Sequence, residues 1–474
     1  MNILQSQDTI CAIATAQGGA IGVIRVSGSD AINITDKIFS PVGKNSVQLA
    51  ERKAYTLAFG HIKNDKGEIV DEVLVSIFRA PHSYTGEDST EISCHGSAYI
   101  MQQIMQLLIA NGCRAAGPGE YTQRAFLHGK MDLSQAEAVA DLIASTSAAT
   151  HRLAMNQMRG GFSKELSALR NKLLHLTSLM ELELDFSDHE ELEFADRSEL
   201  KEIADSIESV ISHLANSFSV GNAIKNGIPV AIIGETNAGK STLLNTLLNE
   251  EKAIVSDIHG TTRDVIEDTI NINGTTFRFI DTAGIRETTD TIESLGIERS
   301  FQKLDQAEIL LWVIDSRETE AQIAQLSDKV LTRSKDKKLV IVLNKMDLCD
   351  NANLASQIQN KYHSVLPKET SIISLSAKYK ERIIELESLL TQLASIPDLS
   401  QNDVVVTNVR HYQALVSALE SIHRVQEGMD MQISGDFISQ DLRECLFHLA
   451  EIVGGKITTD EVLGNIFKHF CVGK

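Results

Sequence analysis

A glycine-containing stretch in the middle of the chain most constrains its fold. Residues 228–248 read "IPVAIIGETNAGKSTLLNTLL", an apolar run of strand length followed by a turn and a helix. "GETNAGKST" (234–242) matches the phosphate-binding loop pattern and follows a strand, as that pattern requires. Backbone N–H groups of such a loop surround phosphate oxygens, while Lys240 supplies charge and the Ser241 hydroxyl can bind Mg²⁺. The stretch therefore predicts a nucleotide site.

Two further motifs predict the surroundings of the terminal phosphate. "DTAG" (281–284) follows the strand "FRFI", which places Asp281 near the metal and the Gly284 amide near the γ-phosphate. "GTTRD" (260–264) precedes a hairpin whose "NG" turn at 273–274 favours type I′. Thr262 is accordingly a second candidate ligand for Mg²⁺.

Two motifs predict recognition of guanine. "NKMD" (344–347) ends the strand "KLVIVL", and Asp347 can accept hydrogen bonds from N1–H and the 2-amino group of guanine, which adenine does not offer. Asn344 and the Lys345 stem would steady the base, and "SAK" (376–378) would add a backbone donor to the guanine carbonyl. Five motifs in this order, each next to a strand or hairpin, predict a GTPase.

The length of the chain and the changes of its apolar pattern along the sequence predict several domains. A chain of 474 residues implies about three domains. We expect an α+β domain over residues 1–120, helical segments over 121–222 and 398–474, and a doubly wound α/β domain over 223–397. The two helical segments flank the α/β block, which suggests that the block is inserted into a helical domain.

Composition limits location and partners. The net charge of −20 disfavours broad nonspecific binding of nucleic acid, so such binding needs a local basic patch or a partner's surface. The apolar runs are of strand length, and no basic signal-peptide region opens the chain. Six cysteines without a C-x-x-C pair suit a reducing compartment. We expect a cytoplasmic protein with no membrane span.

The chain resembles the MnmE (TrmE) family of tRNA-modification GTPases over essentially its full length. The resemblance rests on "IGVIRVSG", "YTGEDSTEISCHG", "PGEYTQRAFLHGKMDLSQAEAVADLI", "DIHGTTRDVI", "DTAGIRETTDTIESLGIERS" and the terminal "FCVGK". It implies a folate-binding N-terminal domain similar to glycine-cleavage T proteins, a helical domain, and an inserted P-loop GTPase domain.

The resemblance also implies an activity and partners. Family members act with an FAD-containing partner, MnmG (GidA), in a heterotetramer or larger complex. They add a carboxymethylaminomethyl or aminomethyl group to C5 of the wobble uridine of certain tRNAs. The one-carbon unit comes from 5,10-methylenetetrahydrofolate or 5-formyltetrahydrofolate. Family proteins form homodimers through their N-terminal domains, and their GTP hydrolysis depends on K⁺ as well as Mg²⁺.

Site residues carried over from the family fall into three sets. The K⁺ ligands are Asn237, Ser256, Ile258 and Thr261, and the folate-binding residues are Arg25, Glu91, Lys130 and Lys474. The catalytic candidates are Glu293, as the group that orients water, and Cys471, as a nucleophile or redox thiol. With the motif residues, the full set of predicted GTP-binding residues is Asn237, Ala238, Gly239, Lys240, Ser241, Thr242, Ser256, Asp257, Ile258, His259, Gly260, Thr261, Thr262, Asp281, Thr282, Ala283, Gly284, Asn344, Lys345, Asp347, Ser376, Ala377 and Lys378.

Two positions depart from related patterns. Ile285 stands where signalling GTPases carry a glutamine that orients water, so another group must do so. Glu293 and Arg286 lie in the segment that follows. Thr236 stands where proline is common in the family, which bears on loop rigidity and not on phosphate binding.

Two other functions remain open on the sequence. A GTP-dependent switch for ribosome assembly would explain the nucleotide motifs but would need neither the folate-domain motifs nor the cysteine tail. A folate enzyme with a structural GTPase domain would predict degenerate nucleotide motifs, whereas all of them are intact. For Cys471 the alternative is a buried structural thiol.

Overall fold

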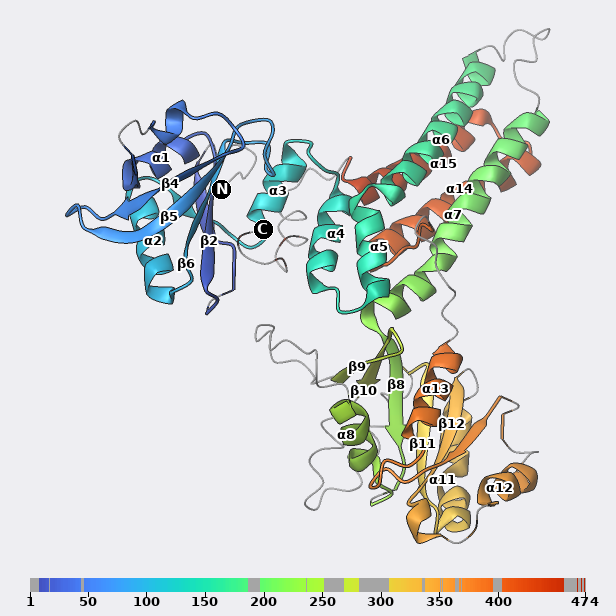
Figure 1. Ribbon diagram of the computed structural model, residues 1–474. Coiled ribbons are helices and arrows are strands. Elements are labelled where there is room, and N and C mark those ends of the chain that lie inside the picture. Colours follow the sequence, from blue (N-terminus) through green and yellow to red (C-terminus); the bar gives the residue numbers. More distant parts are fainter. Residues whose placement is uncertain are drawn as a thin grey trace. The chain divides into compact units, whose positions relative to one another are not determined.

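The computed structural model describes residues 8–16, 18–43, 47–185, 197–235, 237–250, 268–280, 307–334, 337–349, 351, 353–362, 366–367, 369–394, 403–455, 467, 470 and 473. These residues form two compact units (Figure 1). The first unit comprises residues 1–144, 154–213 and 413–474, and the second comprises residues 145–153 and 214–412. As predicted, the α/β block lies in the chain between segments of the helical part.

The first unit begins with a seven-stranded sheet in the order β3-β4-β5-β6-β2-β1-β7. Neighbouring strands are antiparallel except β1 and β7, which are parallel. The strands are β1 (Ile10–Ile13), β2 (Ile21–Ser27), β3 (Phe39–Pro41), β4 (Thr56–Lys63), β5 (Ile69–Phe78), β6 (Ser89–His95) and β7 (Arg114–Ala115). The strand predictions over "YTLAFGHI", "EIVDEVLVSIF" and "STEISCHG" are confirmed.

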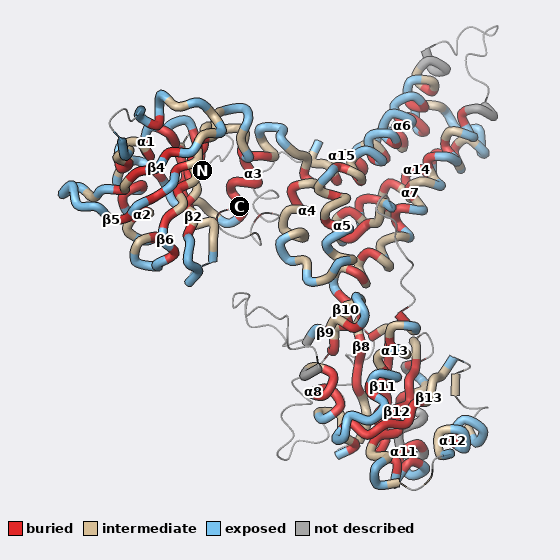
Figure 2. Tube along the Cα trace, viewed as in Figure 1, coloured by how far each residue is buried: buried red, intermediate tan, exposed pale blue. Residues whose placement is uncertain are grey.

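Over β4 and β5 this sheet buries only one of its faces, whereas at β1 Ile10 and Ala12 on the other face pack against Tyr121. Along β5, burial alternates with a period of two, so Val73, Val75 and Ile77 face the core while Leu74 is 45% exposed. Helices α1 (Ala31–Ile38) and α2 (Ala98–Ala110) pack on the buried face. The other face of the sheet we call the open face; it carries exposed Leu57, Phe59 and Leu74. Figure 2 shows exposed stretches of the chain along β5.

Helices form the rest of the first unit. Helix α6 buries Leu166, Leu169, Leu173 and Leu176 at three- and four-residue spacing, and it packs against α15. A short helix, η2 (Leu49–Glu51), precedes β4. The longer helices are α3 (Glu120–Leu127), α4 (Leu133–Ala144), α5 (Ala148–Met158), α6 (Gly161–Asp185), α7 (Arg197–Asn226), α14 (Val409–Asp430) and α15 (Gly435–Val453). Helices α5, α7 and α14 extend into the second unit.

The second unit is built on a six-stranded sheet in the order β13-β12-β11-β8-β10-β9. All its pairs are parallel except β9 with β10. The strands are β8 (Ile228–Ile233), β9 (Asp268–Ile272), β10 (Thr275–Ile280), β11 (Ile309–Asp315), β12 (Lys338–Asn344) and β13 (Ser371–Ser374). The β9–β10 turn has positive φ at Asn273 (52°) and Gly274 (83°), as the predicted type I′ turn requires.

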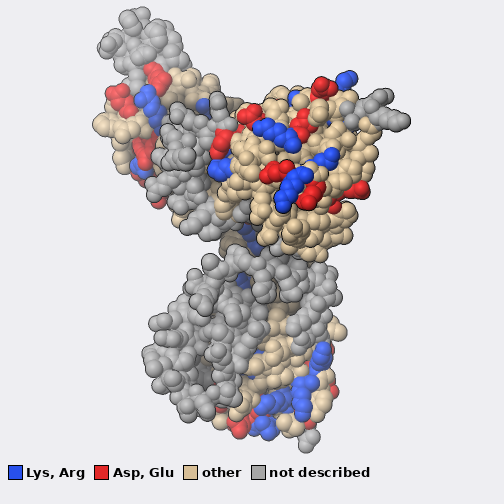
Figure 3. Space-filling view, turned by 90° about the vertical axis from the view of Figure 1, so that its left-hand side faces the viewer, with Lys and Arg blue, Asp and Glu red and all other residues tan. Residues whose placement is uncertain are grey.

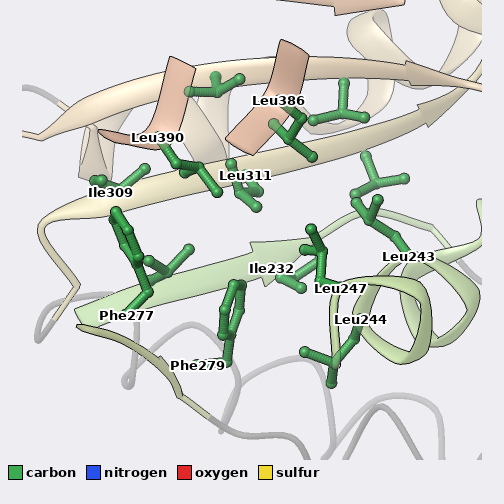
Figure 4. Packing of buried hydrophobic residues seen from close by; sticks show 14 of the residues in the cluster. Ile232, Leu243, Leu244, Leu247, Phe277, Phe279, Ile309, Leu311, Leu386 and Leu390 are labelled. Carbon is green, nitrogen blue, oxygen red and sulfur yellow. The ribbon is translucent and has the colours of Figure 1, made fainter. Parts of the chain in front are cut away.

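Helices cover both faces of this second sheet. Every residue of β11 is buried, with Leu311 and Val313 in one apolar cluster and Leu310 and Trp312 in the other. Such a strand needs a continuous apolar run and not an alternating one. Figure 4 shows the first cluster, in which Leu243 and Leu247 of α8 and Leu386 and Leu390 of α13 meet the strands. The helices are α8 (Lys240–Glu250), α11 (Thr319–Arg333), α12 (Leu354–Tyr362), α13 (Ile383–Ala394) and the short η3 (Met346–Leu348).

The architecture contains the α+β, helical and doubly wound α/β parts that the sequence predicts. Within the described residues, no helix combines the length and the apolar character needed to cross a bilayer.

Candidate functional site

The nucleotide motifs lie at the carboxyl ends of the parallel strands in the second unit. The loop from Gly234 follows β8, "NKMD" begins on the last residue of β12, and "SAK" follows β13. In open α/β sheets, ligands bind at this edge. The fold therefore brings together three motifs that are spread over residues 234–378 of the chain.

Side-chain hydrogen bonds join the three motifs directly. Asn344, which is 2% exposed, donates from Nδ2 to the carbonyl oxygen of Ala238 at 2.9 Å. Its Oδ1 accepts from the Ala377 amide at 3.0 Å. Thr246 of α8 donates to the Ala377 carbonyl at 3.0 Å. Asn344 thus fixes the phosphate-binding loop against the "SAK" loop, so its role includes holding the walls of the site.

Two residues of the phosphate-binding loop have left-handed backbone conformations. Asn237 and Gly239 have φ values of 66° and 98°. A Cβ at Gly239 would clash with the side-chain amide of Asn344, so both φ and space require glycine there. Lys240 begins α8, and its Nζ donates to the carbonyl oxygens of Gly234 and Glu235, each at 2.8 Å. Burial lowers the pKa of Lys240, and the charge of Glu235 opposes that shift.

Asp347 is the exposed member of the guanine motif. Its Oδ1 accepts a hydrogen bond from the Ser376 hydroxyl at 2.5 Å. The backbone of Met346 also donates to the Leu375 carbonyl at 3.2 Å. Asp347 and the "SAK" loop therefore form one rigid corner, with a carboxylate available to a base. Lys378 lies at the same corner, is exposed, and has its Nζ 5.2 Å from the Tyr379 ring centroid.

Sequence reasoning missed the loop that supports Lys345. Nζ of Lys345 lies 2.8 Å from Oδ2 of Asp315 and 2.6 Å from the carbonyl oxygen of Asn237. Asp315 is the last residue of β11, and the Ser316 hydroxyl donates to the Lys345 carbonyl at 3.0 Å. The sequence does contain a signal for this loop. In "WVIDS" a buried parallel strand ends with an acidic and a hydroxyl residue, at the edge of the sheet where ligands bind.

A second group of predicted residues meets on the open face of the first unit. Arg25 of β2 and Glu91 of β6 are register partners, and both Nε and Nη2 of Arg25 donate to Glu91 Oε1, at 2.9 and 2.7 Å. Their side chains are 18% and 28% exposed. The Arg25 guanidinium lies 5.4 and 5.6 Å from the ring centroids of Tyr84 and Tyr121.

The carboxyl-terminal region of the chain reaches this pair. Nη1 of Arg25 donates to the carbonyl oxygen of Gly473 at 3.2 Å, across 448 positions of sequence. A Cβ at Gly473 would press on the backbone of Ile13 and Ala14, next to β2. Phe467 and Phe470 pack with Phe126 of α3 in a small apolar cluster. The tail is thereby seated beside Arg25.

Lys130 contacts the connection between β5 and β6 (residues 79–88), and not the Arg25–Glu91 pair. Its Nζ donates to the carbonyl oxygen of Pro81 at 2.9 Å, and its stem lies against Gly86. Tyr84, in the same 79–88 connection, hydrogen-bonds Thr122 of α3 at 2.9 Å. The connection between β5 and β6 thus contacts Lys130 and carries the aromatic ring beside Arg25. Several predicted site residues fall outside the described residues, namely Ser256, Asp257, Ile258, His259, Gly260, Thr261, Thr262, Asp281, Thr282, Ala283, Gly284, Glu293, Cys471 and Lys474.

An ion-pair cluster supports the aromatic wall of this second site. Arg124, only 5% exposed, contacts the carboxylates of Asp8, Glu87 and Glu120 at 2.8 to 3.0 Å. Burial favours a higher pKa for Glu120, but hydrogen bonds from Arg114 and the Gly117 amide hold it below its usual value. Helix α3 is therefore fixed by paired charges, and Tyr121 on that helix donates to the Arg25 carbonyl at 2.7 Å.

Comparison with known proteins agrees over the whole chain. The family model described as MnmE helical domain matches residues 133–471, and the one described as GTP-binding protein TrmE N-terminus matches residues 9–130. The tRNA modification GTPase MnmE of Bacteroides fragilis is 68% identical over 469 residues, which cover 99% of this chain and 100% of that protein. The chain belongs to the MnmE family.

Other MnmE proteins match equally fully. That of Bacteroides thetaiotaomicron is 68% identical over 473 residues, covering 99% of this chain and 100% of its own. That of Porphyromonas gingivalis is 50% identical over 481 residues, covering 100% of both chains. This MnmE-family protein is a GTP hydrolase, and its fold combines the N-terminal, helical and P-loop GTPase parts of the family.

Proposed function

We propose that the protein is a potassium-dependent GTPase that modifies C5 of the wobble uridine of certain tRNAs. It would act with an FAD-containing partner and a tetrahydrofolate one-carbon donor. One observation carries the proposal: full-length identity of 68% to proteins named tRNA modification GTPase MnmE. The alternatives of an assembly switch and of a folate enzyme with a structural GTPase domain have no such support.

The nucleotide site divides its work among the strand-end motifs. Lys240 pairs with the β- and γ-phosphates, Ser241 and Thr262 bind Mg²⁺, and Asp281 and the Gly284 amide meet the metal and the γ-phosphate. Asp347 accepts from guanine, beside the Ser376–Lys378 loop. The hydrogen-bonded corner of Asn344, Asp347, Ser376 and Ala377 supports this assignment, because it presents a carboxylate and backbone amides on a fixed frame.

Hydrolysis would use K⁺ and Glu293. Asn237, Ser256, Ile258 and Thr261 are the proposed K⁺ ligands, and an added cation near the β/γ bridge can supply the charge that an arginine finger supplies elsewhere. Asn237 has a left-handed backbone, and Lys345 holds its carbonyl oxygen by a hydrogen bond. A fixed backbone supports the role of Asn237 as a K⁺ ligand, because it limits the directions that the side chain can take. Glu293 would orient the attacking water in place of the glutamine that Ile285 replaces.

Folate would occupy the open face around Arg25 and Glu91. A pterin edge offers N–H donors to the Glu91 carboxylate, and the glutamate tail offers carboxylates to cations such as Lys130 and Lys474. The half-buried ion pair between two tyrosine rings fits a flat polar ring system. When bound, the folate would supply the one-carbon unit. Gly473 at the pair would place Cys471 and Lys474 close to the same site.

Self-association and partner binding would use exposed surfaces of the protein. The open face carries exposed Leu57, Phe59 and Leu74, which support a homodimer through the N-terminal sheets. In the upper part of Figure 3, Lys and Arg side chains lie among Asp and Glu side chains. A chain with a net charge of −20 repels the phosphates of tRNA, and a surface of mixed charge does little to offset that repulsion. This supports a tRNA-binding surface that is shared with the MnmG-type partner. The proposed location is the cytoplasm.

The proposal is tested by nucleoside mass spectrometry of tRNA from cells that lack the protein. The carboxymethylaminomethyl or aminomethyl group at C5 of wobble uridines should disappear and should return when the gene is restored. Unchanged wobble uridines would contradict the proposed function.

The ion dependence is tested by stopped-flow GTP hydrolysis. Wild-type protein should turn over much faster in K⁺ than in Na⁺. Glu293→Ala should bind GTP normally but lose on the order of 10²–10⁴-fold in turnover, in either ion, because the water is no longer oriented. Near-wild-type turnover by this variant would move the catalytic role to another residue, with nucleotide binding as the control.

A further inference from the structure

The turn that follows β11 is tied to the guanine motif by three contacts. Asp315, whose side chain is 6% exposed, accepts from Nζ of Lys345 at 2.8 Å. The Ser316 hydroxyl donates to the Lys345 carbonyl at 3.0 Å, and the Ser316 amide donates to the Asn344 carbonyl at 2.9 Å. Lys345 also donates to the carbonyl oxygen of Asn237 at 2.6 Å. One lysine therefore links this turn to the phosphate-binding loop.

Lys345 needs such support because of its backbone. Its φ is 63°, in the left-handed region that a residue with a Cβ rarely occupies. Conformations of this kind persist only where the surroundings fix them. Ser316 fixes the carbonyl oxygen of Lys345, while Asp315 fixes the far end of its side chain. The two residues together hold Lys345 at both ends.

Asp315 is itself held in its charged form. Hydrogen bonds from Arg317 come first among the causes, with Nε and Nη2 at 3.0 and 2.7 Å, and the Lys345 ammonium adds to them. Together they hold the pKa of Asp315 far below its usual value, although burial alone would raise it. The start of α11 fixes the backbone too, since the Asp315 amide donates to Gln322 Oε1 at 3.1 Å. A permanent, immobile carboxylate thus faces Lys345.

We propose that Asp315 and Ser316 are positioning residues of the guanine-nucleotide site and act through Lys345. This inference rests on the proposed role of residues 344–347 in binding guanine. Without Asp315, the Lys345 side chain keeps only the Asn237 carbonyl, and the stem beside the base is free to turn away. Loss of either residue should therefore speed nucleotide release without changing the preference for guanine.

The release rate of GDP carrying a fluorescent methylanthraniloyl group tests the proposal on the full-length protein. Asp315→Asn should release this probe about tenfold faster than wild type, the scale of one hydrogen bond to a charged group. Ser316→Ala should release it a few times faster and keeps the test available if Asp315→Asn fails to fold. Release within twofold of wild type by both variants would overturn the proposal.

A matched control lies at the other end of the same two strands. Glu308 pairs with Lys338 at 3.0 Å, next to the first residues of β11 and β12. Glu308→Gln removes one ion pair across the β11–β12 pair but leaves the ligand edge intact, so its release rate should match wild type. If Glu308→Gln releases the probe as fast as Asp315→Asn, the effect is general to the strand pair and the proposal fails.

A double-mutant cycle separates positioning from general stability. Lys345→Met should speed release, and adding Asp315→Asn to it should change the rate little, because Asp315 then has no lysine to hold. Independent, multiplying effects would contradict action through Lys345. An Asp347→Asn variant that still prefers GTP would instead contradict the guanine-binding role of residues 344–347. Failure of the positioning role and failure of the guanine-binding role are therefore distinguishable.

Discussion

The two sheets of the molecule differ in how they are covered and in where they carry function. The mainly parallel sheet of the second unit has helices on both faces, and its strand β11 is buried at every residue. Its polar groups are left to the strand ends, where the nucleotide motifs lie. The mainly antiparallel sheet of the first unit buries one face along β4 and β5, and Arg25 and Glu91 lie on the other.

This difference teaches what kind of site each sheet can hold. A strand end passes into a loop, so residues that are adjacent in sequence can surround a phosphate or a base. An open face is assembled from separate strands, so its site joins residues that are distant in sequence. The Arg25–Glu91 pair spans 66 positions, and the Gly473 contact spans 448. A site in loops would recognise its ligand through backbone groups and motif residues, whereas a site on the open face would recognise it through side chains that the strand register brings together.

The largest predicted effect breaks the strand-end site. Asp347→Asn places an amide donor opposite the donors of guanine and suits the C2 carbonyl of xanthine. Preference for GTP over xanthosine triphosphate should fall by about 10³-fold or more, since buried polar groups left unpaired discriminate strongly. Competition of both nucleotides for the fluorescent GDP probe measures it. A variant that prefers GTP as strongly as wild type would show that Asp347 does not read the base.

Alanine substitutions at neighbouring residues of one strand test whether one or both faces of each sheet are packed. In β11, Leu310→Ala and Leu311→Ala should each lower the free energy of unfolding by about 2–5 kcal/mol, because both faces are packed. In β5, Val75→Ala should cost about 2 kcal/mol and Leu74→Ala about 1 kcal/mol or less.

Urea unfolding measures these costs through two signals, Trp312 fluorescence for the second unit and far-UV circular dichroism for the whole protein. Trp312 is the only tryptophan of the chain and lies buried in β11, so its fluorescence follows the second unit alone. Far-UV circular dichroism follows the β5 variants. Equal costs for Leu74 and Val75 would contradict a sheet with one open face.

The open-face site should respond to its own substitution and leave hydrolysis unchanged. Arg25→Ala removes the cation that fixes Glu91, so affinity for 5-formyltetrahydrofolate should fall about tenfold to a hundredfold, the scale of charged hydrogen bonds. Titration calorimetry measures the binding. Glu72→Ala changes an exposed charge on the same face and should bind folate as wild type does. Equal folate affinity in Arg25→Ala and wild type would remove Arg25 from the site.

The smallest effect concerns thiol chemistry. Burial raises the pKa of Cys94 to about 11 and that of Cys445 to about 12. Because the thiolate reacts, alkylation of both should be negligible at pH 8 and should rise only as the pH approaches those values. Half-buried Cys349 should react first among the described cysteines. Peptide mass spectrometry after brief iodoacetamide treatment measures the order; early labelling of Cys445 would contradict its burial.

The sequence predicted the strand-end site better than the open-face site, for a physical reason. The loop at 234–242, "NKMD" and "SAK" each carry their own strand and turn signals, so their placement follows from local pattern. Arg25 and Glu91 have no such signal, because their meeting depends on the register of β2 with β6. Only the family resemblance pointed to them.

Supporting contacts were the least predictable part of both sites. The polar strand end of Asp315 and Ser316 predicts a place at the ligand edge, but their link to Lys345 depends on the order of strands in the sheet. The rings of Tyr84 and Tyr121 come to Arg25 from a connection and a helix that no pattern relates. Such contacts are set by tertiary packing and not by local periodicity.

Both sheets should be needed for one product, and complementation tests this most directly. Cells that lack the protein would receive wild type, Lys240→Ala, Arg25→Ala or Cys471→Ser, and their tRNA wobble uridines would be measured by mass spectrometry. Wild type should restore the C5 modification, while each variant should fail to do so, although Arg25→Ala and Cys471→Ser keep normal GTP turnover. Full modification by Arg25→Ala, or by Lys240→Ala, would contradict the claim that the two sites serve one reaction.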